Sequence, residues 1–193
     1  MIRDVDMKSA ARFLAIIMTI TAICRPGMAG DAIRLNLTVS APKADCVDVP
    51  LCAVIEVPET LAGDPEHAGF HYRAHNDVAS GGKEVKATYL FPDDGVDPKK
   101  DKDLPWAAMS YGLNNQRYCV LHMNHPDNPR PTIYSAYRDY GRFGAFFTHT
   151  IKSGESLHLC YRIWIVGGEM PARERFAGKC SAFVDCPQVK VLD

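Results

Sequence analysis

Four groups of residues have the types and spacing that ligand binding or catalysis would use. The first lies in residues 69–75, where the polar residues His71, Arg73 and His75 alternate with Phe70, Tyr72 and Ala74. On a β-strand the three polar residues share one face at intervals of about 6.6 Å, which suits a hydroxyl-rich or anionic ligand. His71 and His75 are then about 13 Å apart, too far to bind one metal ion. The alternative is a strand face that is simply exposed to solvent.

The second group lies in residues 122–131, His-Met-Asn-His-Pro-Asp-Asn-Pro-Arg-Pro. Three prolines restrict the backbone of this segment and so fix the side chains that it carries. His125 is a candidate catalytic acid, and Asn128 and Arg130 offer an amide and an anion-binding guanidinium. His122 joins them as a ligand-binding candidate, and it shares a metal ion with His125 only if the chain turns sharply between them. A structural turn is the alternative.

The third group is Arg138, Tyr140 and Arg142, which alternate in the run Arg-Asp-Tyr-Gly-Arg-Phe-Gly of residues 138–144. Tyrosine rings stack on sugar rings, and guanidinium groups bind carboxylates through two parallel hydrogen bonds. These three residues are therefore candidates for binding a carbohydrate or a carboxylate. The alternative is a cation–π and ion-pair cluster that only supports the start of a strand.

The fourth candidate is Glu169, which follows two glycines at the end of an apolar stretch. A carboxylate at a strand end could act as a general base on a sugar ring, with His71 or His125 as the acid. A structural role for Glu169 is the alternative. The sequence contains no G-x-S-x-G, P-loop, G-x-G-x-x-G or H-E-x-x-H motif, so none of the reactions tied to those motifs is indicated.

Apolar and polar residues alternate along most of the chain, and this period of two is typical of β-strands. Short turns rich in Gly, Asn, Asp and Pro separate the strand-like segments. Those segments are residues 33–40, 51–57, 70–75, 85–91, 106–113, 117–123, 143–151 and 157–166. The pattern predicts an all-β fold, an antiparallel β-sandwich or barrel, with one short helix near the C-terminus at residues 171–177 that Gly178 ends.

The N-terminus has the features of a secretory signal peptide. Basic residues precede an apolar run of 11 residues, 13–23, which is too short to span a bilayer, and Gly27-Met28-Ala29 provides a cleavage site. We expect residues 1–29 to be removed; an acylated Cys24 or an uncleaved anchor are the alternatives. Residues 30–60 would then hold the N-terminal strands, and residues 61–193 the β-sandwich domain.

The mature chain would carry 18 basic and 21 acidic residues, a net charge of −3, and no segment long enough to span a membrane. This composition predicts a periplasmic or extracellular protein and gives no electrostatic reason to bind nucleic acid.

Six cysteines remain after the predicted cleavage: Cys46, Cys52, Cys119, Cys160, Cys180 and Cys186. An even number in an exported protein favours disulfides, although six cysteines allow 15 pairings. The same C-x5-C spacing separates Cys46 from Cys52 and Cys180 from Cys186. A disulfide could also join the strand-like stretches that contain Cys119 and Cys160. Buried thiols are the main alternative, because the C-x2-C spacing of thiolate metal sites is absent.

Segments 67–74, 106–111, 125–129 with 137–144, and 161–170 together resemble an exported bacterial family labelled methane oxygenase PmoA-like, a domain of unknown function. The most specific of them are His-Pro-Asp-Asn-Pro at 125–129 and the arginine–tyrosine run at 138–144. The resemblance covers roughly residues 61–175. It implies a β-sandwich of the galactose-mutarotase-like supersandwich kind, here with a short N-terminal part, and it carries over no catalytic residues.

These patterns predict an exported β-sandwich protein that binds a carbohydrate or another small polar ligand. Whether it also processes that ligand stays open, because catalysis requires a His–Glu pair to assemble. A non-catalytic binding or structural module of the cell envelope is the alternative. A metal-dependent oxygenase, as the family label suggests, would need His71, His122 and His125 to converge from distant strands. No cofactor is expected.

Overall fold

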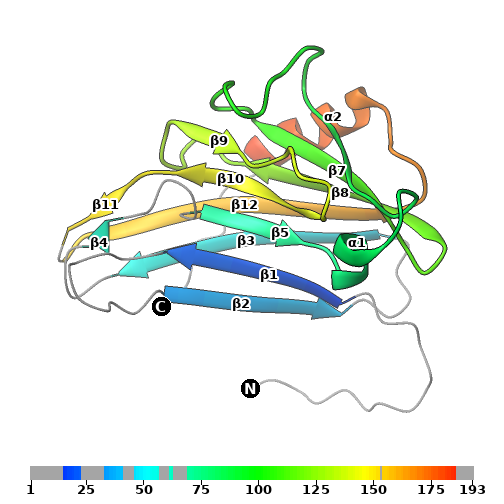
Figure 1. The fold of residues 1–193 in the computed structure, drawn as a ribbon. Coiled ribbons are helices and arrows are strands. Elements are labelled where there is room, and N and C mark those ends of the chain that lie inside the picture. The colour runs from blue at the N-terminus through cyan, green and yellow to red at the C-terminus, as the bar shows by residue number, and fades with distance from the viewer. Residues whose placement is uncertain are drawn as a thin grey trace.

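In the computed structural model the chain forms two five-stranded antiparallel sheets that pack face to face (Figure 1). The structure describes the backbone of residues 15–22, 33–40, 46–56, 61–62, 69–152 and 154–185, and the side chains of residues 69–152 and 154–185. The predicted all-β antiparallel sandwich is confirmed.

Sheet A, as we call the first sheet, has the strand order β2 (Ile33–Ser40), β1 (Ala15–Ala22), β5 (Gly69–Arg73), β10 (Arg142–Phe147) and β9 (Thr132–Tyr134). Sheet B has the order β3 (Cys46–Glu56), β12 (Ser156–Gly167), β8 (Gln116–Asn124), β7 (Trp106–Leu113) and β6 (Thr88–Leu90). A separate pair joins β11 (Thr150–Ile151) to β4 (Leu61–Ala62).

Both faces of sheet B are covered, which explains why its central strands read as continuous apolar runs. On β7, Ala107, Met109 and Tyr111 belong to the core between the two sheets. Trp106 and Ala108, on the opposite face of the same strand, belong to a second apolar cluster. The hairpin between β7 and β8 turns at Asn114 and Asn115, which both have positive φ.

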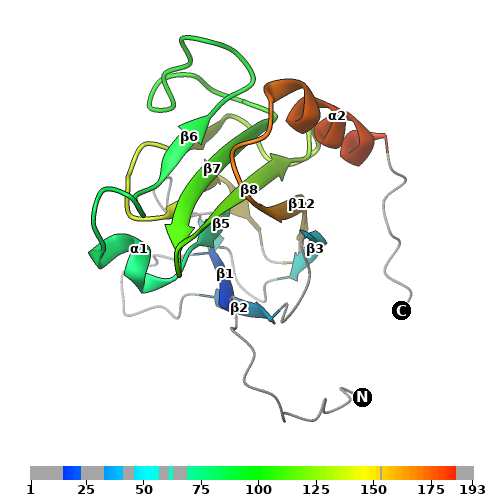
Figure 2. The same cartoon turned by 90° about the vertical axis from the view of Figure 1, so that its right-hand side faces the viewer.

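Helix α2 (Arg173–Val184) covers the outer face of sheet B (Figure 2). Phe176, Cys180 and Phe183 are buried in the second apolar cluster because their spacing places them on one side of the helix. The predicted helix is confirmed, but it does not end at Gly178 because this apolar stripe continues beyond the glycine. The charged groups of Arg175 and Lys179 each lie 5.0 Å from the centre of the Trp164 ring.

A second helix, α1 (Asn76–Ser80), was not expected from the sequence. His75 precedes it, and its Nδ1 accepts a hydrogen bond of 3.3 Å from the backbone N–H of Asp77. Strand β5 therefore ends at Arg73, and His75 caps a helix instead of continuing the polar row. The prediction that His75 shares a strand face with His71 and Arg73 is wrong for this reason.

Residues 15–22, from the apolar run of the predicted signal peptide, form β1 between β2 and β5. Removal of residues 1–29 stays a prediction, and the remainder of that segment lies outside the described residues. Within the described part of the chain, no helix has the length and hydropathy needed to cross a membrane.

The strand registers exclude two of the predicted disulfides. Cys119 lies opposite Val166 on β12, six residues from Cys160, and Cys119, Cys160 and Cys180 form no disulfide in the structure. Cys46 and Cys52 are also six residues apart on the single strand β3. Six residues of strand span about 20 Å, whereas disulfide-bonded Cα atoms lie within about 7 Å. Cys186 lies outside the described residues, so its pairing with Cys180 stays a prediction.

Candidate functional site

His122 lies in the centre of the sandwich and is completely buried. Its Nε2 is 3.0 Å from the carbonyl oxygen of Phe70 on sheet A, and its Nδ1 is 3.1 Å from the Tyr134 hydroxyl. The Phe70 carbonyl can only accept, so Nε2 carries the proton and donates it. His122 therefore connects the two sheets, and this interior position argues against the prediction that it binds a ligand.

Burial lowers the pKa of His122 from its ordinary value of 6.5 to about 4, because the charged imidazolium would lose its solvation. Between pH 6.5 and about pH 4, His122 is therefore neutral in the native protein but protonated in the unfolded chain. Stability contributed by this difference is fully present above pH 6.5 and is lost as the pH falls toward 4. Through His122 alone, the free energy of unfolding should drop by about 2 kcal/mol between pH 7 and pH 5.

The pH behaviour of His122 can be measured directly by NMR titration of the labelled imidazole ring. We expect the His122 nitrogen shifts to remain those of a neutral ring, protonated at Nε2, from pH 8 down to pH 5. His149, which is exposed, provides the internal control. An inflection for His122 near pH 6.5 would contradict its buried, neutral role.

His71 lies on the outer face of sheet A, since Phe70 and Tyr72 on either side of it point into the core. Only 6% of His71 is exposed. It faces Gly144 of β10, where an added Cβ would come within 2.5 Å of the His71 Cβ, and its ring packs 5.8 Å from that of Phe146. Gly144 is thus required for the close approach of these two strands.

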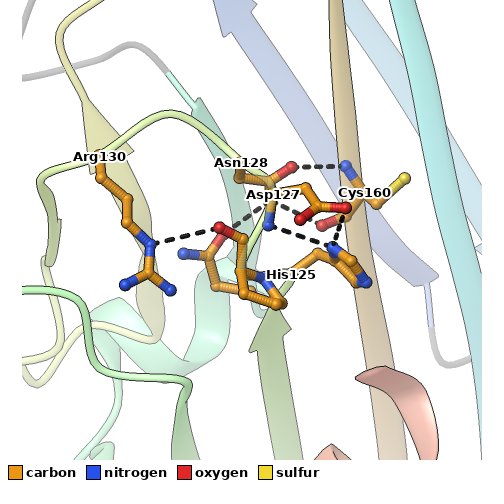
Figure 3. Close-up of polar contacts among 7 residues, drawn as sticks. His125, Asp127, Asn128, Arg130 and Cys160 are labelled. Atoms are coloured by element: carbon orange, nitrogen blue, oxygen red, sulfur yellow. Dashed lines mark hydrogen bonds and ion pairs between the residues drawn. The ribbon is translucent and has the colours of Figure 1, made fainter. Parts of the chain in front are cut away.

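The proline-rich loop after β8, residues 125–131, is joined to Cys160 of β12 by hydrogen bonds (Figure 3). Asn128 Nδ2 donates to the Cys160 carbonyl at 2.6 Å, and Asn128 Oδ1 accepts from the Cys160 N–H at 2.7 Å. Nδ2 also donates to Asn124 Oδ1 at 2.7 Å. Asn128 therefore bonds to β12 as a neighbouring strand would, and these contacts favour a structural role over the predicted role in ligand binding.

His125 is buried against helix α2, with its ring 5.3 Å from that of Phe183. Its Nδ1 accepts a hydrogen bond of 3.2 Å from the Asp127 N–H, a contact within the loop. Arg130 is exposed, and its Nε donates to the Pro126 carbonyl at 3.3 Å. Of the candidates in this loop, only Arg130 presents its charged group to solvent.

The structure does not assemble the predicted acid–base pairs. The backbone N–H of His125 bonds to Cys160, which lies inside β12, and Glu169 follows the C-terminal end of that strand at Gly167. About 23 Å of strand separates Cys160 from Gly167. His71 projects from the outer face of the other sheet. The Glu169 side chain is 88% exposed and lies 4.0 Å from Arg117. Among the described residues, no group of three His, Cys, Asp or Glu side chains could hold a metal ion.

Two of the sequence candidates do come together on the outer face of sheet A. Arg73 of β5 and Arg142 of β10 are direct cross-strand partners, two pairs along the register from His71 and Gly144. Arg73 donates to Asn76 Oδ1 at 3.4 Å. No carboxylate in the described residues forms an ion pair with either guanidinium. Side chains of directly paired strand residues lie close together on one face, so the two positive charges are neighbours.

A second basic group lies in the turn that leads into β10. Arg138 donates to the Tyr140 hydroxyl at 2.6 Å, and its guanidinium carbon lies 5.3 Å from the centre of the Tyr137 ring. Lys99 also lies over that ring, at 4.9 Å. Tyr89 fixes the turn by donating a hydrogen bond of 2.6 Å to the Arg138 carbonyl. We call Arg138, Tyr137, Tyr140 and Lys99 the turn cluster.

Sequence reasoning found Arg138 and Tyr140 but missed Lys99 and Tyr137. Lys99 belongs to the charged run of residues 93–103, which has the composition of an ordinary solvated loop. Only the fold brings that loop to Tyr137, 38 residues later in the chain. Tyr137 is 42% exposed, which is unusual for a large aromatic residue in this structure.

Comparison with known proteins places the chain in a family. No curated protein and no solved structure matches it. The resemblance to the methane oxygenase PmoA-like family stays a prediction. A family model described as "Family of unknown function (DUF6807)" matches residues 46–180, which is more than half of the chain. The match includes the proline-rich loop, Arg73, Arg142 and the turn cluster, and the chain therefore belongs to the DUF6807 family.

Proposed function

We propose that this protein is an exported, non-catalytic module that binds an acidic carbohydrate. The observation that carries the proposal is the direct pairing of Arg73 with Arg142 across β5 and β10. Like charges placed opposite each other on neighbouring strands destabilise a sheet. An anionic group bound between the two guanidiniums would remove that repulsion.

The chemistry of the two arginines favours a carboxylate or sulfate ester as the anionic group. Each guanidinium presents a planar set of N–H donors that matches the oxygens of a carboxylate and binds it bidentately. Both arginines lie on a sheet, which holds their backbones in a fixed register. Sites on such elements are positioned more accurately than sites on loops.

The turn cluster supports the choice of a sugar as the group that carries the acid. It offers the Tyr140 hydroxyl, the partly exposed Tyr137 ring and the charged groups of Arg138 and Lys99. Hydroxyls and amphipathic rings suit a polyhydroxylated ligand, and the added cations suit one with further negative charge. The same turn leads directly into Arg142.

Binding without turnover is favoured by the positions of the other titratable candidates. His122 and His125 are used inside the structure, and Glu169 lies at an exposed strand end beside Arg117. A purely structural envelope module would present the same fold without a ligand, and a binding measurement separates the two functions.

The test is a comparison of the wild type with Arg73→Gln, Arg142→Gln and the double variant. Binding of an oligogalacturonate would be measured by isothermal titration calorimetry. Each charge-assisted bond is worth about 1.5–3 kcal/mol, so we expect Kd to rise about tenfold or more in each single variant. Arg130→Gln makes the same change of charge in the proline-rich loop and should bind as the wild type does. Equal weakening in Arg130→Gln, or unchanged binding in the double variant, would refute the assignment.

A further inference from the structure

Two cysteines from distant parts of the chain are direct register partners on two neighbouring strands of sheet B. The register of β3 and β12 pairs Cys52 with Cys160. Cys160 is buried, with 7% of its surface exposed. Strand β3 is the edge strand of sheet B, so its attachment to the sheet depends on β12 alone.

The hydrogen bonds of Cys160 show whether it occupies a hydrogen-bonded or a non-hydrogen-bonded position relative to β3. Its N–H donates to Asn128 Oδ1, and its carbonyl accepts from Asn128 Nδ2 and, at 3.2 Å, from the His125 N–H (Figure 3). The N–H and C=O of one strand residue point to the same side of the strand. Both groups of Cys160 therefore point toward the proline-rich loop, and away from β3. Relative to β3, Cys160 occupies a non-hydrogen-bonded position.

A non-hydrogen-bonded pair in an antiparallel sheet brings the Cα atoms of the two residues to about 4.5 Å. Disulfide-bonded cysteines have Cα separations of about 4.4–6.8 Å, so this position satisfies the requirement without movement of the strands. Cys46 and Cys119 do not meet this distance requirement. Both pair with Val166 of β12, one from each side, so they are about two strand spacings, roughly 9.6 Å, apart.

We propose that Cys52 and Cys160 form a disulfide that joins the edge strand β3 to β12 when the protein is in an oxidising environment. In this reaction the two thiols lose two protons and two electrons as the S–S bond forms. A low-molecular-weight disulfide such as oxidised glutathione accepts the electrons, its own S–S bond breaks, and it leaves as two thiols. The exchange passes through a mixed disulfide with one of the two cysteines.

Peptide mapping tests the proposal on the full-length chain. The purified protein is incubated with oxidised glutathione, remaining thiols are alkylated with iodoacetamide, and the digest is analysed by mass spectrometry. We expect a cross-linked peptide that contains Cys52 and Cys160, while Cys119 is recovered alkylated. The cross-link should disappear on reduction and be absent from Cys160→Ser. It should be unchanged in Cys119→Ser, which removes another buried thiol of sheet B.

The wild-type map alone can overturn the proposal, so it does not depend on how well a variant folds. Recovery of Cys52 and Cys160 in alkylated form after oxidation would contradict it. So would a cross-link from either residue to another cysteine, such as Cys180 of the helix that packs over Cys160. As a second readout, the oxidised wild type should melt at a higher temperature than the reduced wild type, and Cys160→Ser should show no such difference.

Discussion

Replacement of His122 with alanine is expected to lower the free energy of unfolding by about 3–5 kcal/mol. The substitution opens a cavity among the rings of Phe70, Phe143 and Tyr161, which contact the imidazole at centroid distances of 5.5–5.8 Å. It also leaves the buried carbonyl of Phe70 without the donor at Nε2. Loss of packing and an unsatisfied buried acceptor act in the same direction, which makes this one of the two largest effects that we expect.

Equilibrium denaturation in urea, monitored by tryptophan fluorescence, measures the effect of His122→Ala. Trp106 and Trp164 are both buried, so their emission should change on unfolding. His149→Ala is the matched control, because it removes an exposed imidazole and should change stability by less than about 0.5 kcal/mol. A loss below about 1 kcal/mol in His122→Ala would mean that the imidazole does not connect the sheets.

The second large effect is expected for Asn128→Ala, with a loss of about 3 kcal/mol. Three buried hydrogen bonds of 2.6–2.7 Å disappear, and the N–H of Cys160 is left without its acceptor. The Cys160 carbonyl keeps its bond to the His125 N–H, which limits the loss. Because Asn128 bonds to the N–H and the carbonyl of Cys160 as a neighbouring strand would, its removal should also weaken the attachment of the loop to β12.

Asp127→Ala is the control for Asn128→Ala, since Asp127 is in the same loop but its carboxylate is 78% exposed. We expect Asp127→Ala to cost less than about 1 kcal/mol in the same denaturation experiment. Hydrogen exchange should show faster exchange of the Cys160 amide in Asn128→Ala and not in Asp127→Ala. If instead Asn128→Ala were as stable as the wild type but had lost oligogalacturonate binding, the loop would be a ligand site and not a structural one.

The sandwich and its strands could be predicted because their signal is local. Alternation of Phe70 and Tyr72 with His71 and Arg73 correctly predicts which side chains point into the core and which point out. The residues at which strands and helices end were harder to predict. Strand β5 stops two residues before His75 because that histidine caps α1, a five-residue helix with too few apolar positions to show a period.

The candidate site could be predicted only in parts, because register is a property of two strands. The sequence singled out Arg73 and Arg142 in separate groups, 69 residues apart, and had no means of pairing them. Register likewise separates Cys119 from Cys160 and brings Cys160 to Cys52.

His122 shows the limit of residue type as a guide to function. Its place near three prolines and a second histidine is typical of a functional loop, yet β8 continues to Asn124 and carries His122 into the core. A neutral imidazole can fill a space among aromatic rings and still satisfy a carbonyl from the opposite sheet. Nothing in the one-dimensional pattern distinguishes this use from ligand binding.

The proposed function is tested most directly with two ligands that differ only at their carboxyl groups. Oligogalacturonate and its fully methyl-esterified form share the sugar backbone, but the ester lacks the carboxylates that Arg73 and Arg142 would bind. Our account predicts that the wild type binds the acid form at least about tenfold more tightly than the ester, and that added salt weakens this binding. Equal affinity for the two forms, or no binding of either, would contradict the proposal that the paired arginines hold an acidic carbohydrate.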